Sequence, residues 1–174
     1  STSGPLSLSE TLAMIVPAMD AVALAHEHGI VHRDIKPDNL HLSRTPTGAI
    51  VPKVLDFGIA KLAQTAGAGS TGTGSVIGTP AYMAPEQAMG RKDVGPPADV
   101  WSMAVVLYEC LTGRLPFDFP EEASPPAVVV TVVTTEPYPI TRFRHDLPAP
   151  VAAVIQTGLA KNVAQRYRTM REFL

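Results

Sequence analysis

The segment from Ala98 to Leu111 is apolar nearly all round, and it constrains the fold more than any other stretch of the sequence. A helix of this composition is predicted to be buried, so the rest of the chain has to pack around it. The 174 residues suit one domain with a hydrophobic core. Hydrophobic residues make up 45% of the chain and charged residues 17%, which indicates a globular domain rather than a disordered tail.

The charge and cysteine content exclude several classes of function. The net charge is -2 and no Lys/Arg cluster is present, so neither nucleic acid nor a membrane surface is an expected partner. The apolar stretches are interpreted as too short to span a bilayer, so we expect no membrane segment in this chain. The lone Cys110 can form neither an intramolecular disulfide nor a zinc site, and its apolar surroundings predict a buried structural thiol.

These features favour a reducing, cytoplasmic setting, with any membrane anchor carried by a longer parent chain. The sequence begins with Ser1 and ends inside the helical pattern Thr169–Leu174. We therefore expect a fragment that is cut from a longer protein at both ends.

An amphipathic helix is predicted near the start of the chain, over Ser9–Glu27. Ser9 is the expected N-cap, Pro17 is expected to kink the helix, and Gly29 is expected to end it. A charged loop, Ile30–Asn39, follows.

The remaining elements are shorter. Strands are predicted at Leu40–Leu42 and Lys53–Leu55 with a turn between them, and helices at Ala149–Ala160 and Ala164–Phe173. Residues 63–75 are mostly Gly, Ala, Ser and Thr, which is typical of a flexible segment or a plain linker. Ala127–Thr135 is ambiguous, because its valines favour a strand by propensity.

Candidate chemistry is concentrated in the polar loop and after the second strand. Asp34 and Asn39 share the loop, and a hairpin of the two strands would place Asp56 beside it. Two carboxylates and an amide carbonyl would then converge with Lys36. Oxygen ligands of this kind suit Mg²⁺, which takes few protein ligands and fills its other positions with phosphate and water. Together these groups could orient a hydroxyl toward a phosphoryl group.

Three short motifs occur in order: His32-Arg33-Asp34-Ile35-Lys36-Pro37-Asp38-Asn39, then Asp56-Phe57-Gly58, then Ala84-Pro85-Glu86. Each is weak alone, but the ordered set resembles the protein-kinase signature H-R-D-x-x-x-x-N, D-F-G, A-P-E. The run from Gly78 to Glu86 is most similar to the bacterial eukaryotic-like Ser/Thr kinases.

The resemblance covers nearly the whole chain and implies its fold. Residues 1–174 would form the C-terminal lobe of the kinase α+β fold, mainly α with a few short strands, with the N-terminal lobe absent. The catalytic loop would be 32–39 and the activation segment 56–86. The resemblance also implies a helix at Ala127–Thr135 despite its valines, since tertiary context often overrides propensity.

The resemblance further implies roles for the site residues. Asp34 would be the catalytic base that orients the substrate hydroxyl, and Lys36 would contact the transferred phosphate and mark Ser/Thr specificity. Asn39 and Asp56 would hold Mg²⁺ against the phosphates of ATP. The structural alternatives are a turn cap for Asp34 and a solvated charge for Lys36.

Other motif residues are expected to be structural. His32 and Phe57 resemble packed spine residues, and Asp99 resembles the buried aspartate that tethers the catalytic loop. Glu86 and Arg166 resemble a buried ion pair, which is costly to break.

Arg33 precedes the catalytic aspartate, as in kinases that are switched by phosphorylation of the activation loop. A phosphate on that loop could pair with Arg33 and order the segment. The candidate acceptors are Ser70, Thr71, Thr73 and Ser75. An unmodified loop is the alternative. Thr79 is expected to hold Asp34 and Lys36 in place rather than to act as a switch.

The sequence contains neither a G-x-G-x-x-G loop before the catalytic loop nor a V-A-I-K lysine. We therefore expect the isolated chain to bind ATP poorly and to need the missing N-terminal lobe as a partner. Two functions remain open. One is phosphoryl transfer from Mg-ATP to Ser/Thr hydroxyls of protein substrates; the other is a catalytically inert lobe that acts as a protein-binding scaffold. A helical domain with chance motifs is a third, much weaker interpretation.

Overall fold

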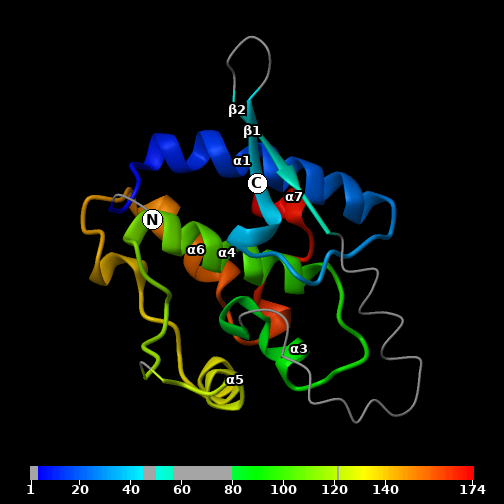
Figure 1. The fold of residues 1–174 in the computed structure, drawn as a ribbon, viewed down its shortest axis with the longest axis vertical. Helices are drawn as coiled ribbons and strands as arrows, with labels where there is room; N and C mark the ends of the chain where they lie inside the picture. The colour runs from blue at the N-terminus through cyan, green and yellow to red at the C-terminus, as the bar shows by residue number, and fades with distance from the viewer. Residues whose placement is uncertain (1–3, 45–49, 57–79, 121) are drawn as a thin grey trace.

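The computed structural model describes residues 4–44, 50–56, 80–120 and 122–174. It is mostly helical with a two-stranded sheet (Figure 1). The helices of four residues or more are α1 (Leu8–Glu27), α3 (Pro85–Ala88), α4 (Pro96–Thr112), α5 (Pro125–Thr134), α6 (Ala149–Gly158) and α7 (Met170–Phe173). Short 3-10 turns are η1 (Pro37–Asn39), η2 (Pro80–Tyr82), η3 (Ile140–Arg142) and η4 (Val163–Gln165), and the strands are β1 (Leu40–Arg44) and β2 (Ile50–Val54).

Helix α4 forms the centre of the fold, as its apolar sequence predicted. Most of its side chains are buried, and helices α1, α6 and α7 pack against it. Trp101 stacks on Phe117 with ring centroids 6.3 Å apart. Helix α6 approaches closely at Gly158, where an added Cβ would lie 2.8 Å from the Ala104 methyl group. A side chain at Gly158 would therefore force the two helices apart.

Helix α1 begins earlier than predicted. Ser7, not Ser9, is the N-cap, because the Ser7 hydroxyl accepts the Glu10 N–H at 3.3 Å while the Glu10 carboxylate accepts the Ser7 N–H at 2.9 Å. The helix continues through Pro17 and ends at Glu27. Gly29 follows with φ of 74°, a conformation that glycine adopts at little cost, so the predicted stop is confirmed.

Among the described helices, α1 is the one long and apolar enough to cross a membrane by length and composition alone. The expectation that every apolar stretch is too short is therefore wrong for this segment. A core helix can meet the same criteria, and α1 lies across α4 and α7 with Ile15, Met19 and Val22 buried. These contacts favour a role in the core.

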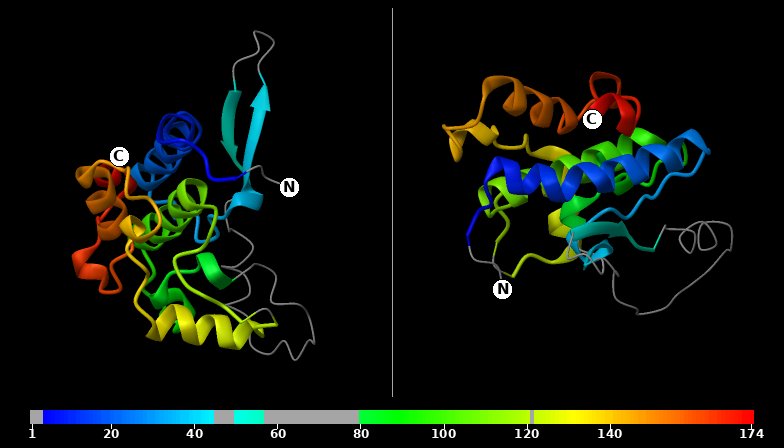
Figure 2. Two further views of the ribbon diagram at one scale, coloured as in Figure 1. Left: turned by 90° about the vertical axis from the view of Figure 1, so that its left-hand side faces the viewer. Right: turned by 90° about the horizontal axis from the view of Figure 1, so that it is seen from above.

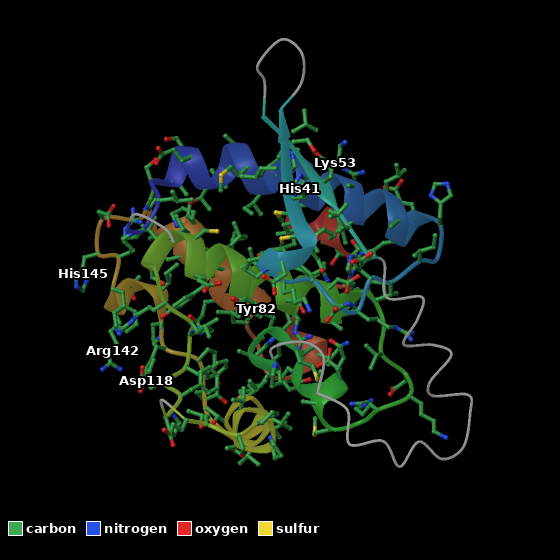
Figure 3. The ribbon with its side chains drawn as sticks, in the orientation of Figure 1. His41, Lys53, Tyr82, Asp118, Arg142 and His145 are labelled. Atoms are coloured by element: carbon green, nitrogen blue, oxygen red, sulfur yellow. The ribbon has the colours of Figure 1, made fainter. Side chains whose placement is uncertain are left out.

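The two predicted strands pair as an antiparallel hairpin that stands away from most of the helical body (Figure 2). His41 faces Lys53 across the pair, and both side chains are labelled in Figure 3. Pro52 lies opposite Leu42. Proline has no N–H to donate, and within sheets it is tolerated on edge strands such as β2. The predicted turn at 45–48 lies outside the described residues.

Segment 125–134 is a helix, which confirms the expectation drawn from the resemblance over the propensity of its valines. Val128 and Val132, four residues apart, are buried on one face of α5. That face lies against η2 and α3, so contact with the rest of the fold decides the local structure.

The single helix predicted for Ala164–Phe173 is wrong. The segment divides into η4 and the short α7, and Arg166 between them is extended, with φ of -92° and ψ of 159°. The extended backbone accompanies a buried ion pair between the Arg166 side chain and Glu86. A continuous helix would gain a few local backbone hydrogen bonds but would lose this ion pair.

Candidate active site

Asp99 ties the loop at residues 32–39, the predicted catalytic loop, to the core helix. Its carboxylate is fully buried in the first turn of α4 and accepts the His32 N–H at 2.8 Å and the Arg33 N–H at 2.7 Å. Arg33 has φ of 63°, a left-handed conformation that costs a non-glycine residue about 1–3 kcal/mol. The two charge-assisted hydrogen bonds offset this cost, and the predicted tether is present.

His32 joins the loop to the end of the hairpin. Its Nδ1 lies 3.3 Å from the Asp34 N–H and can only accept there, so its Nε2 carries the proton and donates to the Leu55 carbonyl at 2.9 Å. The side chain is completely buried. This agrees with the structural role predicted for His32, which fixes Asp34 relative to the end of β2.

The catalytic loop brings together three of the predicted site residues. The Asn39 amide nitrogen donates to the Asp34 carbonyl at 2.7 Å and to the Asp34 carboxylate at 3.3 Å. Lys36 Nζ lies 3.4 Å from the same carboxylate. The side chains of Lys36 and Asp34 are 12% and 25% exposed, so the carboxylate can still be reached by a substrate. Because the amide nitrogen of Asn39 faces Asp34, its oxygen is left as a ligand atom.

Asp56 follows β2 and is exposed, with φ of 52°. It is connected to the loop through its neighbour, since the Leu55 N–H donates to the Asn39 carbonyl at 2.8 Å. Within the described ranges, no group of three His, Cys, Asp or Glu side chains could hold a metal alone. One amide oxygen and one carboxylate nevertheless fit Mg²⁺, which uses one or two protein ligands beside phosphate and water.

The Ala84-Pro85-Glu86 motif is fixed by a buried ion pair. The Arg166 guanidinium donates to both Glu86 oxygens at 2.8 and 3.2 Å, and to the carbonyls of Pro97 and Ala160 at 2.8 and 3.0 Å. It also lies over the Trp101 ring, 5.1 Å from its centroid. The predicted Glu86–Arg166 pair is confirmed, and the hydrogen bonds that Arg166 donates to Glu86 and Pro97 join segments 80 and 69 residues apart.

Gln87 has a role that the sequence reasoning missed. Its side chain donates to the Arg33 carbonyl at 3.0 Å and accepts the Ala84 N–H at 3.3 Å. It thus connects the start of α3 to the catalytic loop. The sequence signal was a glutamine in the first turn of a helix, where such a side chain can cap the N-terminus.

Tyr82 is a second missed residue. Its hydroxyl donates to Glu109 at 2.6 Å, and its carbonyl accepts the Ser102 hydroxyl at 2.8 Å, so α4 holds the segment just before α3 (Figure 3). Burial, aided by Glu109, raises the pKa of Tyr82 far above its ordinary value. The phenol therefore remains a neutral donor.

Of the residues in the predicted phosphorylation switch, the structure describes only Arg33. The Arg33 side chain donates to the Val94 carbonyl at 3.0 Å, while its buried Nε has no partner among the described residues. The candidate acceptors Ser70, Thr71, Thr73 and Ser75 lie outside the described residues, as do the predicted spine residue Phe57 and the predicted positioning residue Thr79. Their roles stay predictions. Cys110 is half-buried, and burial raises the pKa of its thiol, which favours the structural interpretation.

Comparison with known proteins identifies the family. The protein kinase domain matches residues 1–173. Serine/threonine-protein kinase PknB of Mycolicibacterium smegmatis is 41% identical over 171 residues, which cover 98% of this chain and 26% of that protein. Pkn1 of Myxococcus xanthus is 42% identical over 97% of this chain and 24% of its own length, and PknA of Mycobacterium tuberculosis is 42% identical over 95% and 36%.

The chain belongs to the protein kinase domain family, as its motifs predicted. It spans between 24% and 36% of the length of these three relatives. All three are named as serine/threonine-protein kinases.

Proposed function

We propose that the chain transfers the γ-phosphoryl group of Mg-ATP to Ser/Thr hydroxyls of proteins, as part of a longer kinase. The observation that carries this proposal is the assembled loop, in which Lys36 and Asn39 both contact the Asp34 carboxylate. Contacts of this kind hold a carboxylate in one orientation, as is needed beside a reacting hydroxyl.

Each residue then has a distinct task. Asp34 accepts the hydrogen bond of the substrate hydroxyl and takes its proton as the new O–P bond forms and the bond between the γ-phosphorus and the ADP oxygen breaks. Lys36 lies close enough to Asp34 to stabilise negative charge on the transferred group. Asn39 orients Asp34 through its amide nitrogen. Its oxygen and the Asp56 carboxylate would hold the metal ion. Bound Mg-ATP supplies the phosphoryl group and neutralises its charge.

The nucleotide site is proposed to be shared with parts of the kinase outside residues 1–174. This sequence carries the Mg²⁺ ligands and the hydroxyl-binding residues, which correspond to the C-terminal lobe. Neither a G-x-G-x-x-G loop nor a V-A-I-K lysine, the parts that cover ATP in this family, precedes His32 in this sequence. The proposed compartment is the cytoplasm, where ATP is available and the lone thiol stays reduced.

The proposal is tested by two matched substitutions in a protein that includes the nucleotide-covering lobe. Asp34→Asn should lower the rate of phosphoryl transfer about 10²–10⁴-fold, because it removes the general base without changing the shape of the side chain. Asp38→Asn, an exposed aspartate in the same loop, should leave the rate within about twofold of the unaltered protein, since it has no part in the proposed transfer.

Equal rates in the two variants would contradict the proposal. A folded, nucleotide-binding protein with no transfer in any form would favour the scaffold function instead. Thermal unfolding of both variants provides the control for folding.

A further inference from the structure

Two exposed arginines, Arg114 and Arg142, both lie over the ring of Phe143. They belong to the segments that precede and follow α5. The Arg114 guanidinium carbon lies 4.5 Å from the centroid of Phe143, and that of Arg142 lies 5.5 Å from the same centroid and 4.2 Å from that of Tyr138. The two cationic centres are therefore at most about 10 Å apart. We call Arg114, Arg142, Tyr138 and Phe143 the arginine platform.

Arg114 and Arg142 differ from most other described arginines in what they contact. Neither forms an ion pair with a carboxylate in the part of the chain that the structure describes, whereas four other arginines do: Arg91, Arg144, Arg166 and Arg171. Stacking on a ring uses the face of a guanidinium and leaves its N–H edge available. Two such edges lie on one surface. The residues of this surface have no role in the proposed phosphoryl transfer.

The two rings of the arginine platform, Tyr138 and Phe143, are fixed by contacts with each other and with neighbouring residues. Phe143 makes edge-to-face contacts with Tyr108 at 6.5 Å and with Tyr138 at 6.2 Å between ring centroids. The Tyr138 hydroxyl donates to Asp118 at 3.1 Å, and its N–H donates to the Pro116 carbonyl. Rings packed in this way hold the stacked arginines in place, which lowers the entropy cost of binding a ligand.

A buried donor lies next to the platform. The Tyr108 hydroxyl is buried and has no hydrogen-bond partner among the described residues, which is uncommon for a buried polar atom. Burial raises the pKa of Tyr108 to about 12, and the charges of Arg114 and Arg142 act on it in the opposite direction. The hydroxyl therefore lies within the field of both arginines and stays protonated.

We propose that the arginine platform binds the phosphate group of a phosphoserine or phosphothreonine in a peptide segment. A phosphate carries close to two negative charges and three acceptor oxygens, so it can engage two guanidinium groups at once. A single carboxylate has one charge and two oxygens, and it matches only one guanidinium fork. Clusters of arginines are a general means of phosphopeptide recognition.

The surroundings of the platform tune its charge. Figure 3 shows Arg142 at the left edge of the molecule, with His145 above it and Asp118 below it. Asp118 places a carboxylate beside the platform and opposes anion binding. Arg144, two residues after Arg142, is occupied by Asp146 and by the carbonyls of Leu6 and Leu111, so it adds little to the site.

The choice of phosphate rests on the proposed function, which would produce phosphoserine and phosphothreonine near this surface. The test is a binding measurement without ATP, so its failure would leave the transfer reaction untouched. The probe is a fluorescein-labelled phosphothreonine peptide with Ala and Gly flanks, followed by fluorescence anisotropy. The same peptide with unmodified threonine is the reference.

The phosphopeptide should bind at least about tenfold more tightly than the reference, because each arginine adds charge-assisted hydrogen bonds. The double variant Arg114→Gln/Arg142→Gln should lose that advantage. Arg171→Gln removes the same charge from an exposed arginine on α7 and should leave binding unchanged. Asp118→Asn keeps an acceptor for Tyr138 and should tighten binding.

Equal binding of the two peptides, or unchanged binding in the double variant, would overturn the proposal. Tighter platform-dependent binding of single-stranded RNA or anionic vesicles would also overturn it. Lysine at both positions keeps the charge but not the stacked fork, so full recovery with lysine would also count against it. Thermal unfolding checks that the double variant folds. If it does not, the single variant Arg142→Gln and the gain in Asp118→Asn decide the question.

Discussion

The Glu86–Arg166 and Arg91–Asp93 pairs have nearly the same geometry and very different surroundings. Their shortest N–O distances are 2.8 and 2.7 Å. The side chains of the first pair are 6% exposed or less, whereas those of the second are more than half exposed. The buried pair joins α3 to the segment before α7, 80 residues later, while the exposed pair spans two residues. Distance alone therefore says little about what a salt bridge does in this molecule.

Because the Glu86–Arg166 pair is buried, removing either partner is expected to destabilise the fold. A charge left unpaired in the interior loses its solvation without compensation, whereas an exposed charge is solvated again when its partner is removed. The same reasoning applies to Asp99, whose carboxylate is completely buried and receives backbone donors from the catalytic loop. Among the described residues, Asp99 and the Glu86–Arg166 pair each join segments that are far apart in the sequence.

The largest expected effect comes from breaking the buried pair. Glu86→Gln leaves the Arg166 cation buried beside a neutral amide, and we expect the free energy of unfolding to fall by about 3–5 kcal/mol. Urea denaturation measures this change. Arg91→Gln, the matched substitution in the exposed pair, should leave the urea midpoint unchanged. A similar loss in both variants would contradict the distinction drawn from burial.

The second effect concerns the loop tether. Asp99→Asn presents an NH₂ group to one of the two backbone N–H groups that the carboxylate now accepts, so one of these donors loses its partner. We expect a loss of about 1–3 kcal/mol and faster amide exchange at His32 and Arg33. Amide exchange followed by NMR measures the local effect. Uniform acceleration across the whole chain would show that Asp99 supports the core and not specifically the loop.

The third effect concerns the hydrogen bond that links Gln87 to the Arg33 carbonyl. Gln87→Ala removes the side chain that joins α3 to the Arg33 carbonyl, and the expected loss is about 0.5–1.5 kcal/mol. Gln87→Glu keeps the acceptor for Ala84 but loses the donor to Arg33, so it should lose most of the same stability. Full stability in Gln87→Glu would show that the contact with Arg33 contributes nothing.

The smallest effect appears only in alkali. The pKa of Tyr82 is raised above its ordinary value of 10, so the folded chain keeps a proton that the unfolded chain releases. The stability associated with Tyr82 is thus complete below about pH 10 and declines as the pH rises above it. Denaturation at pH 9 and pH 11 should show a smaller decline in Tyr82→Phe. An equal decline in both proteins would contradict the pKa shift.

The sequence predicted the local features of this protein better than its long-range contacts. The catalytic-loop motif and the buried central helix were predictable because their signals lie within short stretches of chain. The link from Gln87 to Arg33 joins residues 54 positions apart, and no local pattern specifies such a partner. The helix predicted through Arg166 failed for a related reason, since a distant carboxylate determines the backbone there.

The most direct test of the central claim is the identity of the amino acid that receives phosphate. A protein that contains this chain and the nucleotide-covering lobe is incubated with γ-labelled ATP and a mixed protein substrate, and the labelled residues are identified after hydrolysis. We expect phosphoserine and phosphothreonine, both lost in Asp34→Asn and retained in Asp38→Asn. Transfer that persists in Asp34→Asn, or label found mainly on tyrosine, would contradict it.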